Sequence, residues 1–140
     1  MKGYKYFLDT NIFLRIIAKD NQSQLLESES LINKITHNKI KAYTSSLVLA
    51  EIVWTCFRGY KLNKEEVNEF LRSILAIKNL RFEEKANVFV ASEMFVSRGI
   101  KFADCLIASH PQILNGQMIV VSYDKDFDKL GVKRLEPVDI

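Results

Sequence analysis

Four acidic residues occur where a carboxylate is unusual unless it has a chemical role: Asp9, Glu51, Asp104 and Asp124. Ionised carboxylates are rarely buried without a partner, and several close together raise one another's pKa unless a cation neutralises them. If the four converge, they form a ligand set made only of oxygen atoms. Such a set favours a hard cation, Mg²⁺ or Mn²⁺, over zinc, and one or two such ions would suit phosphoryl chemistry.

Two of these residues follow apolar runs with the character of β-strands. Asp9 ends an aromatic run at residues 4–8, and Asp124 lies just past a continuous apolar run at residues 118–122. Ligand sites in open α/β sheets lie at the carboxyl ends of the strands. Capping of the following helix is the simpler explanation for Asp9. Asp126 is an alternative ligand, because it lies in the same short segment as Asp124.

The other two residues lie in apolar helical segments. The neighbours of Glu51, from Leu47 to Trp54, are all apolar and predict a helix that is buried on every side. A salt bridge to a buried Arg or Lys is the simpler explanation for Glu51, and a metal ion or a paired base is the chemical one.

Asp104 lies in the first turn of an apolar helix, where the helix dipole stabilises an anion by about 0.3–1 kcal/mol. The dipole does not explain why the residues around Asp104 are apolar.

The elements that must position these carboxylates alternate in type along the chain. We expect strands at residues 4–8, 39–43, 80–82, 118–122 and 132–135, and helices at 11–18, 22–38, 46–57, 63–77, 84–97, 102–114 and 125–130. This alternation predicts an α/β fold with a mostly parallel central sheet of about four or five strands, flanked by helices on both faces. The chain has 140 residues and shows no repeat or linker, so we expect residues 1–140 to form a single domain.

Composition excludes several classes of protein. No apolar run approaches the roughly 20 residues of a membrane span, and Met1 to Gly3 lead directly into the first strand without the features of a secretory signal. We therefore expect a cytoplasmic protein without a membrane partner. Cys56 and Cys105 are expected to be buried free thiols, and no zinc-binding spacing occurs. The net charge of +3 permits an anionic partner without requiring one.

Four segments of the chain, taken in order, resemble the motifs of a known family. Phe7-Leu8-Asp9-Thr10-Asn11, Ser45 to Glu51, Phe102 to Ala108 and Val121 to Phe127 resemble the motifs of a PIN domain, and more narrowly those of the VapC toxins of type II toxin–antitoxin systems. Any one motif is weak, but all four in this order and at these separations are specific. The resemblance covers essentially the whole chain.

This resemblance implies a ribonuclease that depends on Mg²⁺ or Mn²⁺, is usually a homodimer and is held inactive by a cognate antitoxin. Its substrate would be single-stranded or structured RNA. By position, Asp9, Glu51 and Asp104 would form the metal-binding core, and Asp124 would complete the acidic quartet. Asn11 and Ser122 would be hydrogen-bond partners of these ligands.

Other functions fit less well. A phosphatase of the haloacid dehalogenase type needs a second aspartate where this chain has Asn11, and a response-regulator receiver has no use for Glu51 within an apolar helix. The remaining alternative is a PIN-like module that binds RNA or protein without cutting. Basic residues near the acidic segments are candidate phosphate contacts, although a solvated surface is the simpler explanation for each: Arg15, Arg58, Lys61, Arg98, Lys101 and Lys125. We expect Phe13, Trp54 and Phe127 to belong to the core.

Overall fold

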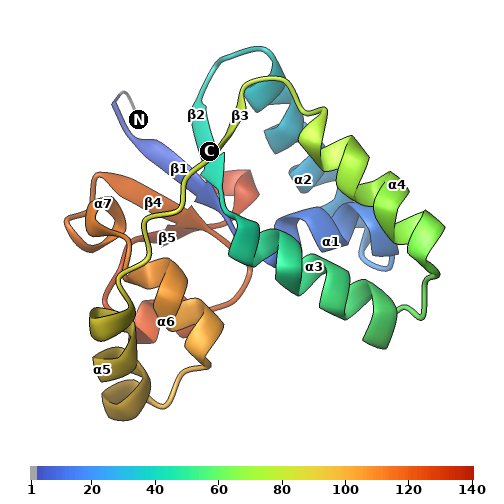
Figure 1. Cartoon of the computed structure of the whole chain (residues 1–140). Coiled ribbons are helices and arrows are strands. Elements are labelled where there is room, and N and C mark those ends of the chain that lie inside the picture. Colours follow the sequence, from blue (N-terminus) through green and yellow to red (C-terminus); the bar gives the residue numbers. More distant parts are fainter. Residues whose placement is uncertain (1–2) are drawn as a thin grey trace.

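A five-stranded parallel sheet forms the centre of the chain in a computed structural model that describes residues 3–140 (Figure 1). The strands are β1 (Lys5–Leu8), β2 (Lys41–Thr44), β3 (Leu80–Phe82), β4 (Met118–Val121) and β5 (Arg134–Leu135), in the order β3-β2-β1-β4-β5. Every neighbouring pair is parallel, so the predicted α/β fold is confirmed with an entirely parallel sheet. The prediction that no secretory signal precedes β1 depends partly on residues 1–2, which lie outside the described residues.

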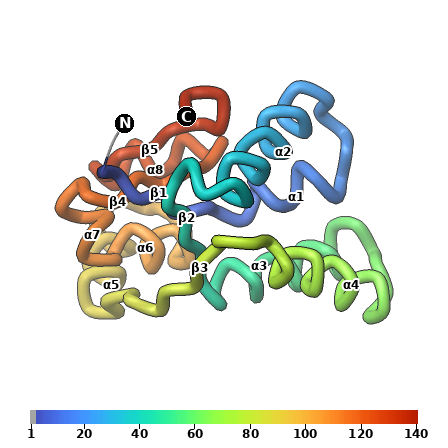
Figure 2. The backbone as a smooth tube through the Cα atoms, turned by 90° about the horizontal axis from the view of Figure 1, so that it is seen from above, coloured from blue at the N-terminus to red at the C-terminus, as the bar shows by residue number. Residues whose placement is uncertain are grey.

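The helices follow the predicted alternation. They are α1 (Thr10–Ala18), α2 (Gln22–Thr36), α3 (Ser46–Arg58), α4 (Lys64–Leu75), α5 (Val88–Arg98), α6 (Phe102–Ala108), α7 (Pro111–Leu114) and α8 (Asp126–Lys129), and a 3₁₀ turn covers Pro137–Asp139. Figure 2 shows α2 on one side of the sheet and α5 and α6 on the other. No helix within residues 3–140 is long and apolar enough to cross a bilayer.

The central strands β1 and β4 bring distant parts of the chain together. Every residue of β4 is buried, as expected for a parallel strand that is covered on both faces. Leu8 pairs with Val121, and the backbone N–H of Asp9 donates to the carbonyl of Val121 over 3.1 Å. The chain therefore leaves both strands at their carboxyl ends, side by side. The strand order changes direction between β1 and β4, and the carboxyl ends of the strands at such a point are the usual position of a ligand site.

Most predicted elements differ from the observed ones by one or two residues at an end, and two helices differ more. The helix expected at 102–114 is broken between α6 and α7, because Pro111 lacks a backbone N–H and disfavours a helical conformation at His110. The helix expected at 84–97 begins only at Val88, because Asn87 caps it with a side chain that accepts from the backbone N–H of Val90. The last strand is shorter than expected at its beginning.

The prediction that α3 is buried on every side is wrong. Trp54 is 61% exposed and Phe57 is 39% exposed, so Trp54 does not belong to the core. Phe13 and Phe127 are buried as expected. Cys56 and Cys105 are buried free thiols, which is also as expected.

Candidate metal centre

Asp9 directly follows β1, and its side chain joins a hydrogen-bond network instead of capping α1. It stands at the N-cap position of α1, but its side chain makes no capping hydrogen bond. One carboxylate oxygen, Oδ2, accepts from the hydroxyl of Ser122 at 2.7 Å and from Nδ2 of Asn11 at 3.4 Å. The capping explanation for Asp9 is therefore wrong, and its 4% exposed carboxylate is oriented by these two donors.

Asn11 and Ser122 tie together the loops that follow β1 and β4. Nδ2 of Asn11 donates to Oγ of Ser122 at 3.0 Å, and Oδ1 of Asn11 accepts from the backbone N–H of Tyr123 at 3.2 Å. The backbone N–H of Asp124 also donates to Oγ of Ser122, at 3.0 Å. The network therefore sets the relative positions of Asp9 and Asp124.

Asp104 is buried without any hydrogen-bond donor. It is 1% exposed, and neither of its carboxylate oxygens has a hydrogen-bond partner among the described residues. Asp104, Asp124 and Asp126 each offer one carboxylate oxygen, and these three atoms all lie within 4.8 Å of one another. A buried carboxylate that lacks a donor and faces two others is suited to a divalent cation, because the cation would supply the missing partner.

Glu51 lies on α3 and faces α1 and α6. Its Oε1 accepts from the hydroxyl of Thr10 at 3.0 Å, and its Oε2 lies 3.9 Å from Nζ of Lys101. The same ammonium lies 3.7 Å from Oδ1 of Asp104. The salt-bridge explanation of Glu51 is thus partly met, although the side chain of Lys101 is 59% exposed and its charge is screened by solvent.

Sequence reasoning assigned no role to Thr10, and it considered Lys101 only as a candidate phosphate contact. Thr10 could have been found from its position directly after Asp9, which places its hydroxyl at the start of α1 next to the predicted site. The signal for Lys101 was its spacing of three residues before Asp104, which places the two side chains on neighbouring positions of one helical turn.

Burial and mutual repulsion raise the pKa of two carboxyl groups. Burial raises the pKa of Asp9 to about 6, and the hydrogen bond from Ser122 opposes the shift. Burial and then the charge of Asp9 raise the pKa of Asp104 to about 8, while Lys101 opposes it. Burial alone would lower the pKa of Lys101, but the carboxylates of Asp104 and Glu51 raise it. Without a divalent cation, Asp104 therefore keeps its proton at neutral pH, whereas Asp9, with a pKa of about 6, is mostly ionised.

The seven acidic or polar residues predicted for the site fall into three connected groups. Asp104, Asp124 and Asp126 have converging oxygens, Asp9 is held by Asn11 and Ser122, and Glu51 connects to Asp104 through Lys101. Both candidates for the fourth acidic position, Asp124 and Asp126, are present in the cluster. The backbone N–H of Asp126 donates to Oδ1 of Asp124 at 2.9 Å, so the two are held in one loop.

Comparison with known proteins decides the family. The PIN domain family model matches residues 6–133 of the chain. The chain belongs to the PIN domain family. This PIN domain is 26% identical over 132 residues to the VapC ribonuclease of Aquifex aeolicus (strain VF5), a match that covers 94% of the chain and 96% of that relative.

Solved structures share the fold of the PIN domain. A chain in the crystal structure of VapBC2 from Rickettsia felis bound to a DNA fragment from their promoter is 25% identical, with a TM-score of 0.65 and coverage of 94% of this chain and 98% of that one. A chain of VapBC-1 from nontypeable Haemophilus influenzae is 17% identical, with a TM-score of 0.64 and coverage of 96% and 98%. The second similarity is one of fold alone.

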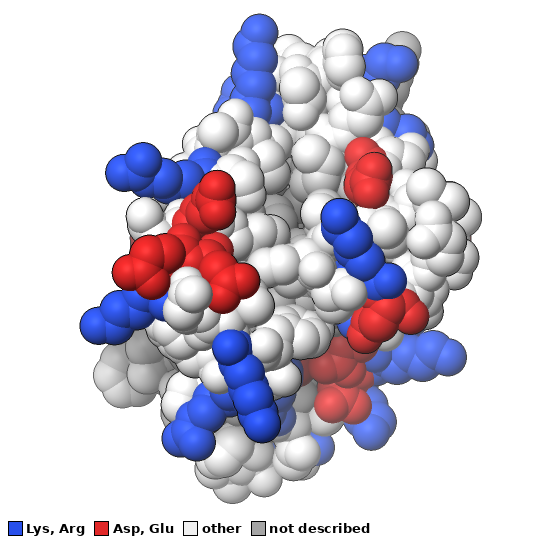
Figure 3. Space-filling model, turned by 90° about the vertical axis from the view of Figure 1, so that its right-hand side faces the viewer, with Lys and Arg blue, Asp and Glu red and all other residues white. Residues whose placement is uncertain are grey.

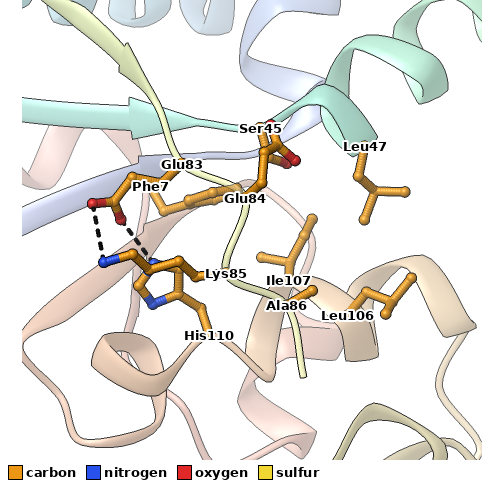
Figure 4. A pocket seen from close by; sticks show the side chains of 10 residues that line it. All are labelled: Phe7, Ser45, Leu47, Glu83, Glu84, Lys85, Ala86, Leu106, Ile107 and His110. Carbon is orange, nitrogen blue, oxygen red and sulfur yellow. Dashed lines mark hydrogen bonds and ion pairs between the residues drawn. The ribbon is translucent and has the colours of Figure 1, made fainter. Parts of the chain in front are cut away.

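A pocket of about 260 Å³ lies in this PIN domain between the segment after β3, the start of α3 and α6 (Figure 4). Leu47 of α3 and Leu106 of α6 line it, and these residues are close in sequence to Glu51 and Asp104 respectively. The two carboxylates that line this pocket, those of Glu83 and Glu84, have hydrogen-bond partners within the protein, whereas that of Asp104 has none among the described residues. The carboxylate of Glu84 accepts from the backbone N–H and the hydroxyl of Ser46, at 2.7 and 2.8 Å.

The second carboxylate of this pocket is paired with a buried histidine. Nδ1 of His110 accepts from the backbone N–H of Gln112 at 3.1 Å, so the neutral ring carries its proton on Nε2. That Nε2 lies 2.9 Å from Oε2 of Glu83 and donates to it. These bonds join the segment after β3 to the junction of α6 and α7. We therefore interpret the polar wall of the pocket as a structural connection.

Proposed function

We propose that this PIN domain is an endoribonuclease that depends on Mg²⁺ or Mn²⁺, cleaves single-stranded or structured RNA and acts as the toxin of a toxin–antitoxin pair. Residues 1–140 would act as one nuclease domain. The observation that carries the proposal is the buried, donor-free carboxylate of Asp104 opposite Asp124 and Asp126. The similarity to a VapC ribonuclease over nearly the whole chain supports it.

The proposed ligands are Asp9, Glu51, Asp104 and Asp124, with Asp126 as the alternative to Asp124, and they would hold one or two ions. A bound divalent cation supplies an activated water and stabilises charge on the phosphate. Only oxygen atoms are offered, which suits Mg²⁺ or Mn²⁺.

The residues around the ligands have separate tasks in this proposal. Ser122 and Asn11 orient the carboxylate of Asp9, and Thr10 orients that of Glu51, through the hydrogen bonds described above. Partners of this kind typically change metal affinity or activity by about 10–100-fold when they are removed. Lys101 is exposed at the edge of the cluster, between Glu51 and Asp104, where its ammonium can contact a phosphate oxygen of the RNA.

Cleavage of a mixed panel of labelled RNAs tests the function. Parent protein and Asp104→Asn are compared in EDTA, Mg²⁺ and Mn²⁺. We expect cleavage by the parent only with a divalent cation, and reduction to background in the variant. Cleavage that does not depend on Asp104 would contradict the proposed site, and binding without cleavage would favour the non-catalytic module.

We also propose that the protein pairs with a second copy through α5 and binds a cognate antitoxin. Only Ala91 of α5 is buried, while four large apolar side chains of this helix are exposed: Val88 60%, Phe89 85%, Phe95 48% and Val96 84%. Val88 and Phe95, like Phe89 and Val96, are seven residues apart and so lie along one side of α5, and an exposed apolar surface of this kind is typical of a protein–protein contact. We therefore propose α5 as the pairing face, in preference to the helices expected from the sequence at residues 22–38 and 63–77, whose apolar residues are also candidates for this role.

Sedimentation of a charged variant tests the pairing. Val96→Glu places a charge among the exposed apolar residues at the C-terminal end of α5 and is expected to shift a dimer towards the monomer. Leu26→Glu is the matched control, because Leu26 is an exposed apolar residue on α2. Equal sedimentation of both variants and the parent would contradict pairing through α5.

A further inference from the structure

One side of α3 connects the candidate centre with an exposed aromatic surface. Leu47, Glu51, Trp54 and Arg58 are spaced by four, three and four residues, which aligns their side chains along one side of the helix. Leu47 lines the pocket shown in Figure 4, and Glu51 belongs to the candidate centre. Trp54 and Arg58 are therefore the next residues along the same row.

Trp54 is presented to solvent with a cation over its ring. It is 61% exposed, and the guanidinium carbon of Arg58 lies 4.6 Å from the ring centroid. This cation–π contact restrains the indole in one orientation. Arg58 takes part in no ion pair among residues 3–140, so its charge remains available to an anion.

The residues that continue this surface are aromatic and basic. Phe57 is 39% exposed, Tyr60 is 36% exposed, and the basic residue Lys61 follows directly. The α5 face differs from it, because within the described chain no Lys or Arg lies over an aromatic ring of α5. Aromatic rings interleaved with basic groups are typical of surfaces that bind single-stranded nucleic acid.

The spacing along α3 fits a substrate that extends from the centre. At about 1.5 Å of rise per residue, Trp54 lies about 4.5 Å and Arg58 about 10 Å along the helix axis from Glu51. Figure 3 shows basic and acidic side chains interspersed on one face of the molecule, without a broad basic field on that face.

We infer that Trp54, restrained by Arg58, is a stacking platform for a base of single-stranded RNA next to the scissile phosphate. This inference deepens the proposed function and depends on it for the location of the cut. Stacking on indole is tolerant of sequence, because every base has a π-face. Arg58 and Lys61 contact the backbone phosphates on either side of the stacked base and set its position without reading its identity.

The fluorescence of Trp54 gives a direct test, because the chain contains one tryptophan. A short single-stranded RNA of mixed sequence is titrated into the Asp104→Asn protein, where no cleavage is expected. Base stacking should quench and shift the emission in proportion to occupancy. RNA that binds without changing the emission would overturn the inference, even if the parent protein is an active nuclease.

Substitutions separate stacking from a structural role. Trp54→Ala should weaken binding of the RNA by about 5- to 150-fold, which is the range measured for loss of one stacked base, and Trp54→Tyr should recover most of it. In the parent background, Trp54→Ala should raise KM more than it lowers kcat. The control is Leu26→Ala, which removes a side chain of similar exposure, 57%, from α2 and should leave binding unchanged.

The outcomes distinguish this inference from the proposed function. Cleavage by the parent with equal RNA affinity for Trp54→Ala and the parent would overturn the platform and leave the nuclease in place. Quenching by RNA without any cleavage by the parent would support the platform and contradict the nuclease. Loss of self-association in Trp54→Ala with unchanged RNA binding would assign the surface to a protein contact and overturn the inference.

Discussion

The carboxylate of Asp104 is 1% exposed and accepts no hydrogen bond from the described residues, and its ion-pair partner Lys101 is 3.7 Å away at the surface, so burial favours a proton or a divalent cation at this group. Asp9 differs from Asp104, because Ser122 and Asn11 donate to it and oppose part of the cost of burial. The two residues therefore respond differently to pH and to substitution. Asp104 is the better place to test for a cation, and Ser122 is the better place to test the support of the ligands.

Stability without metal should fall as pH rises, because of Asp104. In the folded protein the pKa of Asp104 is raised from 3.8 to about 8. Between these values the unfolded chain binds fewer protons than the folded protein, so the free energy of unfolding decreases with increasing pH. In EDTA, Asp104→Asn should therefore be more stable than the parent at pH 8, and the difference should shrink towards pH 4. Urea unfolding of both proteins measures this, and a difference independent of pH would contradict it.

Ser122→Ala should weaken both the fold and the site. The buried hydroxyl donates to Asp9 and accepts from Asn11 and from the backbone N–H of Asp124. Its loss leaves buried groups unpaired, at a cost of about 1–3 kcal/mol in the free energy of unfolding. Affinity for Mn²⁺ should also fall by about 10–100-fold. Chemical denaturation and calorimetric titration measure the two effects, and unchanged Mn²⁺ affinity would contradict the orienting role of Ser122.

At the scale of elements, α3 is held at its start by a residue outside it. Ser45 occupies the N-cap position, but its side chain makes no capping hydrogen bond. The carboxylate of Glu84 instead accepts from the backbone N–H and the hydroxyl of Ser46. A carboxylate at a helix N-terminus satisfies a free N–H and interacts favourably with the helix dipole. Glu84 therefore fixes the helix that carries Glu51 and Trp54.

Removal of this contact should be measurable as a loss of stability. Glu84→Ala should lower the free energy of unfolding by about 0.5–2 kcal/mol, which is the usual range for a lost cap. Glu29→Ala is the control, since Glu29 is an exposed glutamate on α2 and has no ion pair among the described residues. Equal unfolding midpoints for both variants in urea would show that Glu84 does not cap α3.

At the scale of the whole molecule, the candidate centre joins segments that fold together. Its residues follow β1 and β4 and lie on α3, α6 and the start of α8. A cation that binds all of them binds only the folded chain, and it must therefore stabilise the fold. This connects the chemistry of the site with global unfolding.

Divalent metal should raise the melting temperature of the parent. At a free Mn²⁺ concentration of 100 times Kd, the added stability is about 2.7 kcal/mol. Asp104→Asn should lose most of this increase, although its melting temperature in EDTA should be higher than that of the parent. Thermal scans with EDTA and with Mn²⁺ measure both effects. A parent melting curve that does not respond to millimolar Mn²⁺ would argue against the site.

The sequence by itself determined the elements and the acidic positions. Alternating apolar strands and helices are local patterns, and so is an aspartate directly after a strand. The parallel α/β fold and the buried strand β4 followed from such patterns. The resemblance to the PIN domain family added the order of the motifs.

Tertiary structure alone decided which side chains are exposed and which contact one another. Thr10 bonds to Glu51 over 41 positions of sequence, and Glu84 replaces Ser45 as the cap of α3 over a separation almost as long. Trp54, in a segment that is apolar throughout, lies at the surface. A local pattern records how apolar a segment is, but burial depends on whether another element covers it. That is set by packing between segments distant in the chain, which is why the donor-free state of Asp104 and the exposure of Trp54 became apparent only in the folded molecule.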